Sequence, residues 1–285
     1  MCIICEQKIQ SPETITNLRI CNKVTSIPPE LTSLRSLYCA VSKLTAIPDT
    51  LVNLELLQCS YTNIKELPML PALTRLHCNN TKITHLPLFP NILYIKCDNS
   101  PIKNIPLFPK LTHLYCCDTH ITEIPQIESL VDLWCNFTRI KTIPYLPNLT
   151  RLFCMNSNIL VLPDRLPSIE VLNISNTMID TIPAYDTLLH LYCSSTNVCK
   201  IPLMPLLGRI ISASCKCLVD IRANQNCLIY TERSYWLNAD NTKIQNLIVC
   251  QKIVKKYLYR NRFNTRLALK NKLPIDLLNI VMSFK

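Results

Sequence analysis

The sequence predicts a β-solenoid with a parallel concave sheet, an extended or 3₁₀ convex side with little helix, and a small C-terminal α-helical segment. Two residue types support this prediction, because each keeps one period along most of the chain, as stacked repeats require. Prolines recur 19 or 20 residues apart at Pro28, Pro48, Pro68, Pro87, Pro106, Pro125, Pro144, Pro163, Pro183 and Pro202. Cysteines keep the same step at Cys39, Cys59, Cys78, Cys97, Cys116, Cys135 and Cys154, and the series continues with Ile174 and Cys193.

The repeat unit reads L-x-x-L-x-C-x-x-T-x-I-x-x-L-P, as the stretch from Leu73 to Pro87 shows. This pattern resembles the leucine-rich repeat, whose strand segment reads L-x-x-L-x-L-x-x-N-x-L, over roughly residues 14–205. The L-P ending and the short step look most like the short repeats of bacterial effector proteins and of giant-virus repeat proteins. Because proline disfavours a helix at and before its own position, the convex side is expected to be extended or 3₁₀.

Cysteine stands in the third apolar position, where the leucine-rich repeat usually has Leu or Val. A strand of the form x-L-x-C-x directs the Leu and Cys side chains to one face, so the thiols are expected in the core, where Cys packs as a small hydrophobe. Neighbouring strands lie about 4.8 Å apart, but in-register Cβ vectors run parallel instead of converging, which disfavours disulfides. So many free thiols predict a reducing compartment.

A hydroxyl residue replaces the Asn of the family pattern in each unit. These residues are Ser42, Thr62, Thr81, Ser100, Thr119, Thr138, Ser157, Thr177 and Thr196. A hydroxyl offers one donor and two acceptors, so it can satisfy backbone groups of the turn that leaves the strand. We expect these residues to hold the turns together and to have no catalytic role.

The variable strand residues form two parallel stripes on the exposed, concave face of the predicted sheet. The first stripe precedes the Cys position and comprises Tyr38, Gln58, His77, Lys96, Tyr115, Trp134, Phe153, Asn173 and Tyr192. The second stripe lies two residues earlier and comprises Ser36, Leu56, Arg75, Tyr94, His113, Asp132, Arg151, Val171 and His190.

Exposed aromatic residues and Arg are typical of interface hot spots, so the stripes predict a protein target on the concave face. Tyr115, Trp134 and Phe153 are the expected anchor. The alternative is that cross-strand aromatic neighbours only stabilise the sheet, by a few tenths to about 1 kcal/mol for each pair.

A catalytic site on this face is not expected. His77, His113 and His190 lie on different units, with Asp132 between them, and no pair is obviously within reach of a nucleophile. We interpret all four as solvated stripe residues. The sequence therefore predicts a protein that is not an enzyme.

Composition argues against cofactor and metal sites. The chain contains a single glycine, Gly208, whereas phosphate-binding loops need glycines in clusters. Cys2 and Cys5 form a C-x-x-C pair, but Cys215 and Cys217, the nearest match in spacing, lie far along the chain. Because a closed zinc site needs four convergent ligands, we predict no metal and no cofactor.

The sequence predicts a soluble, intracellular protein of the cytoplasm. Its first residues lack the basic start and long apolar run of a signal peptide, and no apolar run approaches membrane-spanning length. No membrane partner is expected.

Three segments are predicted: an N-terminal cap over 1–13, a solenoid over 14–248 that is irregular after 205, and a basic helical tail over 249–285. Residues 237–247 restore the repeat template, with Ala239 in the Cys position and Thr242 in the hydroxyl position. We interpret this stretch as the last unit. Ile248 replaces the proline, so the chain is free to continue into a helix.

From Asn241 to Lys285 ten Lys and Arg oppose Asp276 alone, which gives this end +9 of the chain's +11. Apolar residues recur there at helical spacing, which predicts a basic amphipathic helix. The helix resembles an IQ motif, the element that calmodulin-type proteins grip, through Gln251, Lys255, Lys256 and Arg260. Cys250 replaces the usual Ile, and Lys256 the usual Gly. A helix that only caps the core is an open alternative, and nucleic-acid binding rests on charge alone.

The apolar-rich stretch from Leu273 to Phe284 resembles the opening helix of an F-box, L-P-x-[DE]-L-L-x-x-I-x-x-[FY]. The matching residues are Leu273, Pro274, Asp276, Leu277, Leu278, Val281 and Phe284. An F-box normally continues for three helices, whereas this sequence stops at Lys285. Poxvirus ankyrin-repeat proteins carry such a truncated C-terminal form, which docks the linker subunit of a cullin ubiquitin ligase. The alternative is an ordinary amphipathic helix that begins with Leu-Pro.

Together these features predict a viral-type adaptor that presents a target, bound on the concave face, to a cullin ubiquitin ligase. The alternative is a plain repeat scaffold whose tail only caps the solenoid or binds a calmodulin-like protein. Nucleic acid is not the expected partner.

Overall fold

The structure is a computed structural model that describes residues 4, 9, 11–215, 218, 220–222 and 227–230. A short 3₁₀ helix, Pro12–Thr14, precedes the first strand. It is the only helix among the described residues, and none of them forms a helix that is long and apolar enough to cross a membrane.

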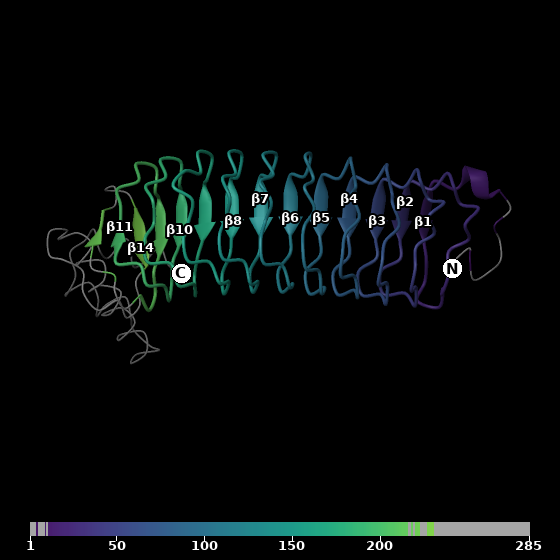
Figure 1. The fold of residues 1–285 in the computed structure, drawn as a ribbon, viewed down its shortest axis with the longest axis horizontal. Coiled ribbons are helices and arrows are strands. Elements are labelled where there is room, and N and C mark those ends of the chain that lie inside the picture. Colours follow the sequence, from purple (N-terminus) through teal and green to yellow (C-terminus); the bar gives the residue numbers. More distant parts are fainter. Residues whose placement is uncertain are drawn as a thin grey trace, which may run out of the picture.

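A 12-stranded parallel sheet runs along the described part of the chain (Figure 1). Each strand has three residues, and each pairs in register with the next. The strands are β1 (Asn17–Arg19), β2 (Ser36–Tyr38), β3 (Leu56–Gln58), β4 (Arg75–His77), β5 (Tyr94–Lys96), β6 (His113–Tyr115), β7 (Asp132–Trp134), β8 (Arg151–Phe153), β9 (Val171–Asn173), β10 (His190–Tyr192), β12 (Arg209–Ile211) and β14 (Leu228–Tyr230). A 2-stranded sheet pairs β11 (Lys200–Ile201) with β13 (Asp220–Ile221).

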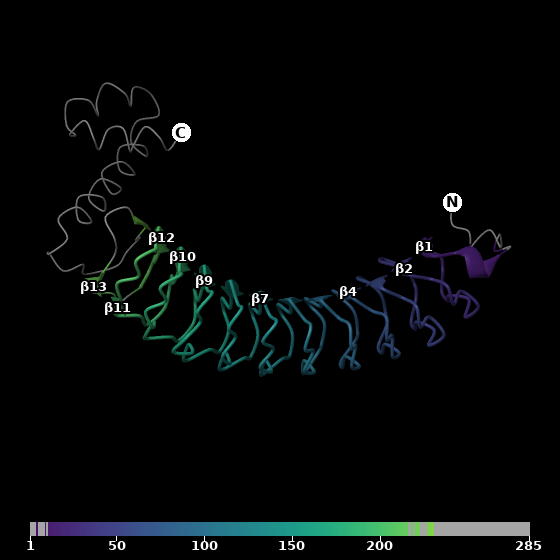
Figure 2. The ribbon, with the colours of Figure 1, turned by 90° about the horizontal axis from the view of Figure 1, so that it is seen from above.

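The sheet lines the inner side of an arch, and the connecting loops form its outer side (Figure 2). The predicted solenoid with a parallel concave sheet and little helix is thereby confirmed. The strand β14 continues the step of 19 residues beyond β12, since Arg209 pairs with Leu228. Sequence analysis did not identify β14.

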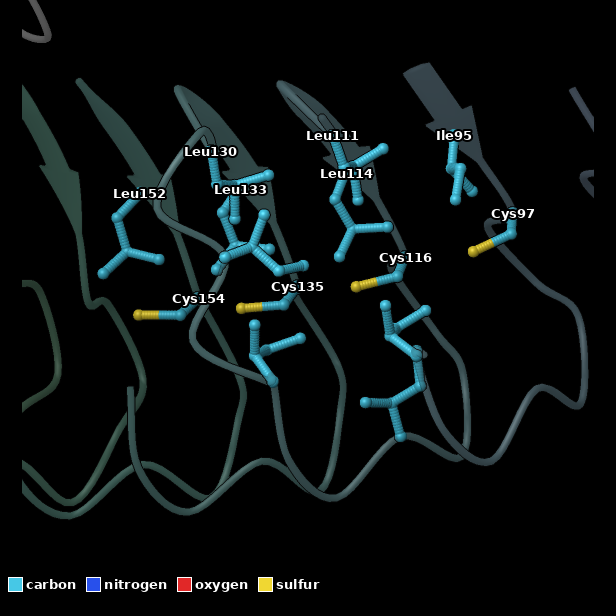
Figure 3. Packing of buried hydrophobic residues seen from close by; sticks show 14 of the residues in the cluster. Ile95, Cys97, Leu111, Leu114, Cys116, Leu130, Leu133, Cys135, Leu152 and Cys154 are labelled. Carbon is cyan, nitrogen blue, oxygen red and sulfur yellow. The ribbon is translucent and has the colours of Figure 1, made fainter. Parts of the chain in front are cut away.

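The core is a continuous column of Leu and Ile packed beside the thiols. The middle residue of each three-residue strand is buried, as Leu114 and Leu133 show, and in the units of β1 to β10 and β12 so is the Cys position that follows it. Figure 3 shows the sulfur atoms of Cys97, Cys116 and Cys135 arranged in a row and pointing the same way. The thiols of this column form no disulfide among the described residues, as the parallel side-chain directions predict.

Burial makes the column thiols weaker acids than exposed thiols, because a thiolate loses its hydration in an apolar core. Burial raises the pKa of Cys39 and of Cys154 to about 12. The same cause raises the pKa of Cys59, Cys78 and Cys135. These side chains therefore act as hydrophobic residues and not as nucleophiles.

The hydroxyl residues close the turns, as expected. Eight of them donate to the carbonyl oxygen of the Cys position three residues earlier, over 2.6–2.9 Å: Ser42, Thr62, Thr81, Thr119, Thr138, Ser157, Thr177 and Thr196. Ser100 differs, because its hydroxyl donates over 2.8 Å to the carbonyl oxygen of Cys78 in the preceding unit.

In the ten units from the one that contains Cys39 to the one that contains Ser212, the turn also contains a left-handed residue, two positions after the Cys position. The φ angles of these residues are between 53° and 60°: Val41, Tyr61, Asn80, Asn99, Asp118, Phe137, Asn156, Asn176, Ser195 and Ser214. Asn and Asp tolerate this conformation better than other non-glycine residues, whereas Val is strained there. The backbone turns here while its N–H still pairs with the next unit, as Phe137 N does with Met155 O over 2.9 Å.

Several predictions fall on residues outside the described ranges. They concern the C-x-x-C pair of Cys2 and Cys5, the unit at 237–247 and the tail at 249–285. The tail contains both the IQ-like and the F-box-like residues, including Lys255 and Leu277.

Candidate partner-binding surface

The two residues that flank the buried centre of each strand form the two predicted stripes. Parallel, in-register pairing aligns them, as in the pairs Tyr94–His113 and Lys96–Tyr115 between β5 and β6. Most of these side chains are half-buried or exposed, and Arg75 and Arg151 are exposed. The stripes lie on the concave side because the strands line the inner side of the arch (Figure 2).

Six rings from β4 to β8 contact one another in a chain that we call the aromatic ladder. Its members are His77, Tyr94, His113, Tyr115, Trp134 and Phe153. The centroid of Tyr94 lies 5.0 Å from that of His77, 5.9 Å from that of His113 and 5.3 Å from that of Tyr115.

The ladder continues to β8 through the predicted anchor. The Trp134 centroid lies 5.6 Å from that of Tyr115 and 4.3 Å from that of Phe153. Such ring pairs add about 0.5–1.5 kcal/mol beyond area burial. The anchor rings therefore form one packed group rather than three independent side chains.

Asp132 differs from the expectation that it is a solvated stripe residue, because its side chain is only 1% exposed. It accepts three hydrogen bonds: from Tyr115 Oη over 2.9 Å, from Trp134 Nε1 over 2.9 Å and from Arg151 Nη2 over 2.7 Å. The burial follows from the size of these neighbours, which cover the short carboxylate from three strands. A buried carboxylate needs such donors to offset its lost hydration.

The Asp132 carboxylate determines which groups of Tyr115 and Trp134 remain available to solvent or to a partner. The Trp134 indole has one donor, and Asp132 accepts it. Burial, and then the hydrogen bond to Asp132, raises the pKa of the Tyr115 phenol, so this group remains a donor. The indole N–H and the phenol O–H are thus satisfied within the protein, and a partner would meet mainly the apolar parts of both rings.

Two basic residues accompany the N-terminal half of the ladder. Lys96 Nζ lies 5.9 Å from the ring centroid of Tyr115, within cation–π range. Burial, followed by the charges of Lys96 and Arg75, lowers the pKa of His77. His77 is therefore a neutral ring at neutral pH, and its surroundings are electropositive.

The predicted residues at the two ends of the stripes lie outside the ladder. Tyr38 contacts Arg19, whose guanidinium carbon lies 5.2 Å from the ring centroid. His190 and Tyr192 belong to β10, and the buried Nδ1 atom of His190 has no hydrogen-bond partner among the described residues. The stripe residues therefore form one central group and two separate ends.

Sequence analysis missed Arg19, although it occupies the same strand position as Tyr38 one unit earlier. The first unit lacks the cysteine that marks the other units, because Ile20 fills its Cys position. Among the described residues no hydrogen bond joins a stripe histidine to Asp132: His113 pairs with Asp132 across β6 and β7, but its Nδ1 lies 2.8 Å from the hydroxyl of Thr112. The described residues contain no group of three or more side chains that could hold a metal ion.

Solved structures with this architecture are leucine-rich repeat proteins. YopM from Yersinia enterocolitica WA-314 is 19% identical, with a TM-score of 0.65 over 80% of this chain and 60% of YopM. The functional domain of InlJ from Listeria monocytogenes, which includes a cysteine ladder, is 22% identical, with a TM-score of 0.64 over 75% of this chain and 54% of that one. A leucine-rich repeat protein from Leptospira interrogans is 19% identical, with a TM-score of 0.57 over 76% of this chain and 72% of that one.

No protein-family model matches the sequence, and no curated protein matches it. The chain spans less than two thirds of YopM and of InlJ. The likeness is one of architecture, and it agrees with the repeat pattern, the parallel sheet and the thiol column. The chain therefore has the leucine-rich repeat fold.

Proposed function

We propose that the protein is a non-enzymatic interaction module that binds a protein target on its concave face. The observation that supports this most is the Asp132 network, in which one buried carboxylate holds Tyr115, Trp134 and Arg151 together. Burying this charge would be an expensive way merely to fill a sheet surface, because apolar residues of similar volume often serve stability as well or better. A fixed group of aromatic and Arg side chains is typical of an interface hot spot.

The rigidity of this group favours binding. Each side chain that a partner must immobilise costs about 0.5–1.5 kcal/mol on association. Here the rings are already packed against one another, with centroids 4.3 Å apart for Trp134 and Phe153. The target would therefore be captured without that ordering cost on this side of the interface.

The test is capture of proteins from a cell extract by the immobilised full chain. We expect Trp134→Ala with Phe153→Ala to lose the partners that the parent chain retains, by quantitative mass spectrometry. Tyr145→Ala is the matched control, because Tyr145 is an exposed aromatic residue outside the sheet. Thermal melting by circular dichroism must show that each variant is folded. If the double variant is not folded, Trp134→Leu, which keeps an apolar side chain, replaces it in the capture experiment. Equal capture by parent and folded variants would refute the proposal.

We further propose that the module is a viral-type adaptor in the cytoplasm, that of the host cell if the protein is viral. In this proposal the F-box-like residues dock the linker subunit of a cullin ubiquitin ligase. The support is the sequence match at Leu273, Pro274 and Asp276 and the order of the segments, with the repeats before the F-box-like residues. The rival is a plain scaffold whose tail caps the solenoid or binds a calmodulin-like protein through Gln251 and its neighbours.

Binding of purified linker subunit to the full chain separates the two. The adaptor requires binding that Leu277→Asp with Leu278→Asp abolishes, while Lys270→Asp, just before the F-box-like residues, leaves it intact. The scaffold predicts no binding by the parent chain. Retention of calmodulin by the parent, but not by Lys255→Glu with Lys256→Glu, would favour the IQ-like alternative.

A further inference from the structure

Acidic and basic residues both occur on and beside strands β4 to β8. The basic side chains keep groups that are open to solvent, whereas the acidic side chains are engaged within the protein. The bases are Arg75, Lys96 and Arg151, and the acids nearest to the aromatic ladder are Asp98 and Asp132. From this imbalance we infer that the concave surface binds an acidic protein segment that carries an apolar side chain. The inference rests on the proposed function and adds the chemistry of the target.

Both acids are already engaged within the protein. Asp132 is buried and accepts from three donors, as described above. Asp98 Oδ1 accepts a hydrogen bond from the backbone N–H of Cys117 over 2.9 Å, which ties this carboxylate to the next unit. Neither carboxylate forms an ion pair with Arg75 or Lys96.

The bases, by contrast, keep donors for a ligand. Arg75 is exposed, and Arg75 and Lys96 form no ion pair with any described residue. Arg151 uses Nη2 for Asp132, and its side chain is 46% exposed. A guanidinium has five N–H donors in a fork that suits carboxylates, so Arg151 can hold Asp132 and a ligand together.

The electrostatic field around His77 also favours a negatively charged ligand. The charges of Lys96 and Arg75 contribute, after burial, to the lowered pKa of His77. Asp98 and Asp132 contribute the opposite sign at Tyr94, but both are already hydrogen-bonded within the protein, so the basic groups that remain open to a ligand attract the opposite charge. The ligand that this surface favours is therefore anionic.

A protein segment fits this surface better than single-stranded nucleic acid. Nucleic-acid platforms need ring faces that are free to stack on bases and a basic groove that follows the phosphates. Here the ring contacts run along the ladder, with His77 and Tyr94 stacked at 5.0 Å and Trp134 and Phe153 only 4.3 Å apart, so neighbouring rings occupy one another's faces. Three bases over five strands match a few carboxylates rather than a continuous phosphate backbone.

The spacing of the strands predicts the spacing of the ligand. Arg75 and Lys96 lie three and two strands from Trp134, or about 14 and 10 Å at about 4.8 Å per strand. An extended segment advances about 3.3 Å per residue, so its acidic residues would lie about three or four positions from the apolar one. A further acid beside the apolar residue would meet Arg151.

Fluorescence anisotropy with the full chain tests this chemistry. The probe is a labelled peptide, Ser-Glu-Glu-Ser-Ser-Phe-Ser-Glu-Ser, and its matched forms replace either the three Glu with Gln or the Phe with Ala. We expect both replacements to weaken binding about tenfold or more in 50 mM NaCl, and we expect added salt to weaken the acidic peptide most. Arg75→Glu and Lys96→Glu should weaken it similarly, whereas Lys82→Glu and Lys103→Glu, at exposed positions outside the sheet, should not.

Several results would overturn the inference. These are no binding of the acidic peptide, equal binding of its Gln form, or equal effects of the strand and control substitutions. Tighter binding of a labelled twelve-nucleotide oligouridylate at the same residues would assign the surface to nucleic acid. Failure here is separable from failure of the proposed function. If Trp134→Ala with Phe153→Ala still abolishes protein capture while Lys96→Glu does not, the surface binds a protein but does not select it by its acidic residues.

Discussion

Trp134 Nε1 donates a hydrogen bond to Asp132 Oδ1, two residues away on the same strand, over 2.9 Å. Alternate residues of a strand share one face, so the short carboxylate and the large indole are neighbours on the concave side. The carboxylate is buried because the indole, the Tyr115 phenol and the Arg151 guanidinium all converge on it. A single buried acid, Asp132, thus fixes the positions of the three side chains that donate to it in the candidate site.

Replacement of this acid should destabilise the fold. In Asp132→Asn the charge that holds Arg151 is lost, and the new amide N–H₂ must point toward donors. Arg151 can return to solvent, so we expect a loss of about 1–3 kcal/mol in the free energy of unfolding, measured by urea titration.

Asp118→Asn is the matched control, because Asp118 is exposed and in a left-handed conformation that Asn also tolerates. Its stability should stay within about 0.5 kcal/mol of the parent. Equal stability of the two variants would show that the Asp132 network contributes nothing to folding.

The left-handed positions offer a stabilising substitution. Val41 has a φ of 58° and is 64% exposed, so it has the strain of a β-branched residue in this conformation and little burial to offset it. We expect Val41→Asn to raise the free energy of unfolding by about 1 kcal/mol. The reverse change in an equivalent turn, Asn80→Val, should lower it, and both are measurable by thermal melting. A destabilised Val41→Asn would mean that the Val side chain has a role that the turn geometry does not show.

The sequence predicted the columns and stripes but not all of their contacts. Period alone assigns Leu133 and Cys135 to the core and Trp134 to the opposite face, because side chains alternate along a strand. The burial of Asp132 could not be predicted in this way, since it depends on the size of residues from neighbouring units. The left-handed position was also hidden, because Val41 and Phe137 stand where other units have Asn or Asp.

The strand β14 was missed because two residues exchange positions in the preceding unit. Ser212 stands in the Cys position, and Cys215 stands in the hydroxyl position. Cys215 nevertheless makes the kind of bond that Ser100 makes, since its Sγ donates to the carbonyl oxygen of Cys193 in the preceding unit over 2.8 Å. A search for cysteines at a fixed step loses the register here, although the backbone period persists.

The hydroxyl position should tolerate Ser but not Val. In Thr138→Val the side chain keeps its shape but can no longer donate to the carbonyl oxygen of Cys135, which the Thr138 hydroxyl contacts over 2.7 Å. Because that hydroxyl position is buried, we expect a loss of about 1–2 kcal/mol in the free energy of unfolding. Thr138→Ser retains the hydrogen bond and should cost less than Thr138→Val. The opposite order in chemical denaturation would show that the methyl group, not the hydroxyl, holds the turn.

The thiol column should make the protein sensitive to alkali. In the folded state burial raises the pKa of Cys154 from its ordinary value of 9.0 to about 12, so the folded thiol stays protonated where the unfolded thiol ionises. The unfolded state then binds fewer protons, and stability falls as the pH rises from about 9 toward about 12. At pH 10.5 this one thiol should cost about 2 kcal/mol relative to neutral pH. Cys154→Val removes the ionisable group, so its free energy of unfolding should fall less than that of the parent between pH 8 and pH 10.5 in urea titrations. Parallel losses in parent and variant would show that the Cys154 thiol ionises as readily in the folded chain as in the unfolded one, and the column would then not be the dry core that its packing indicates.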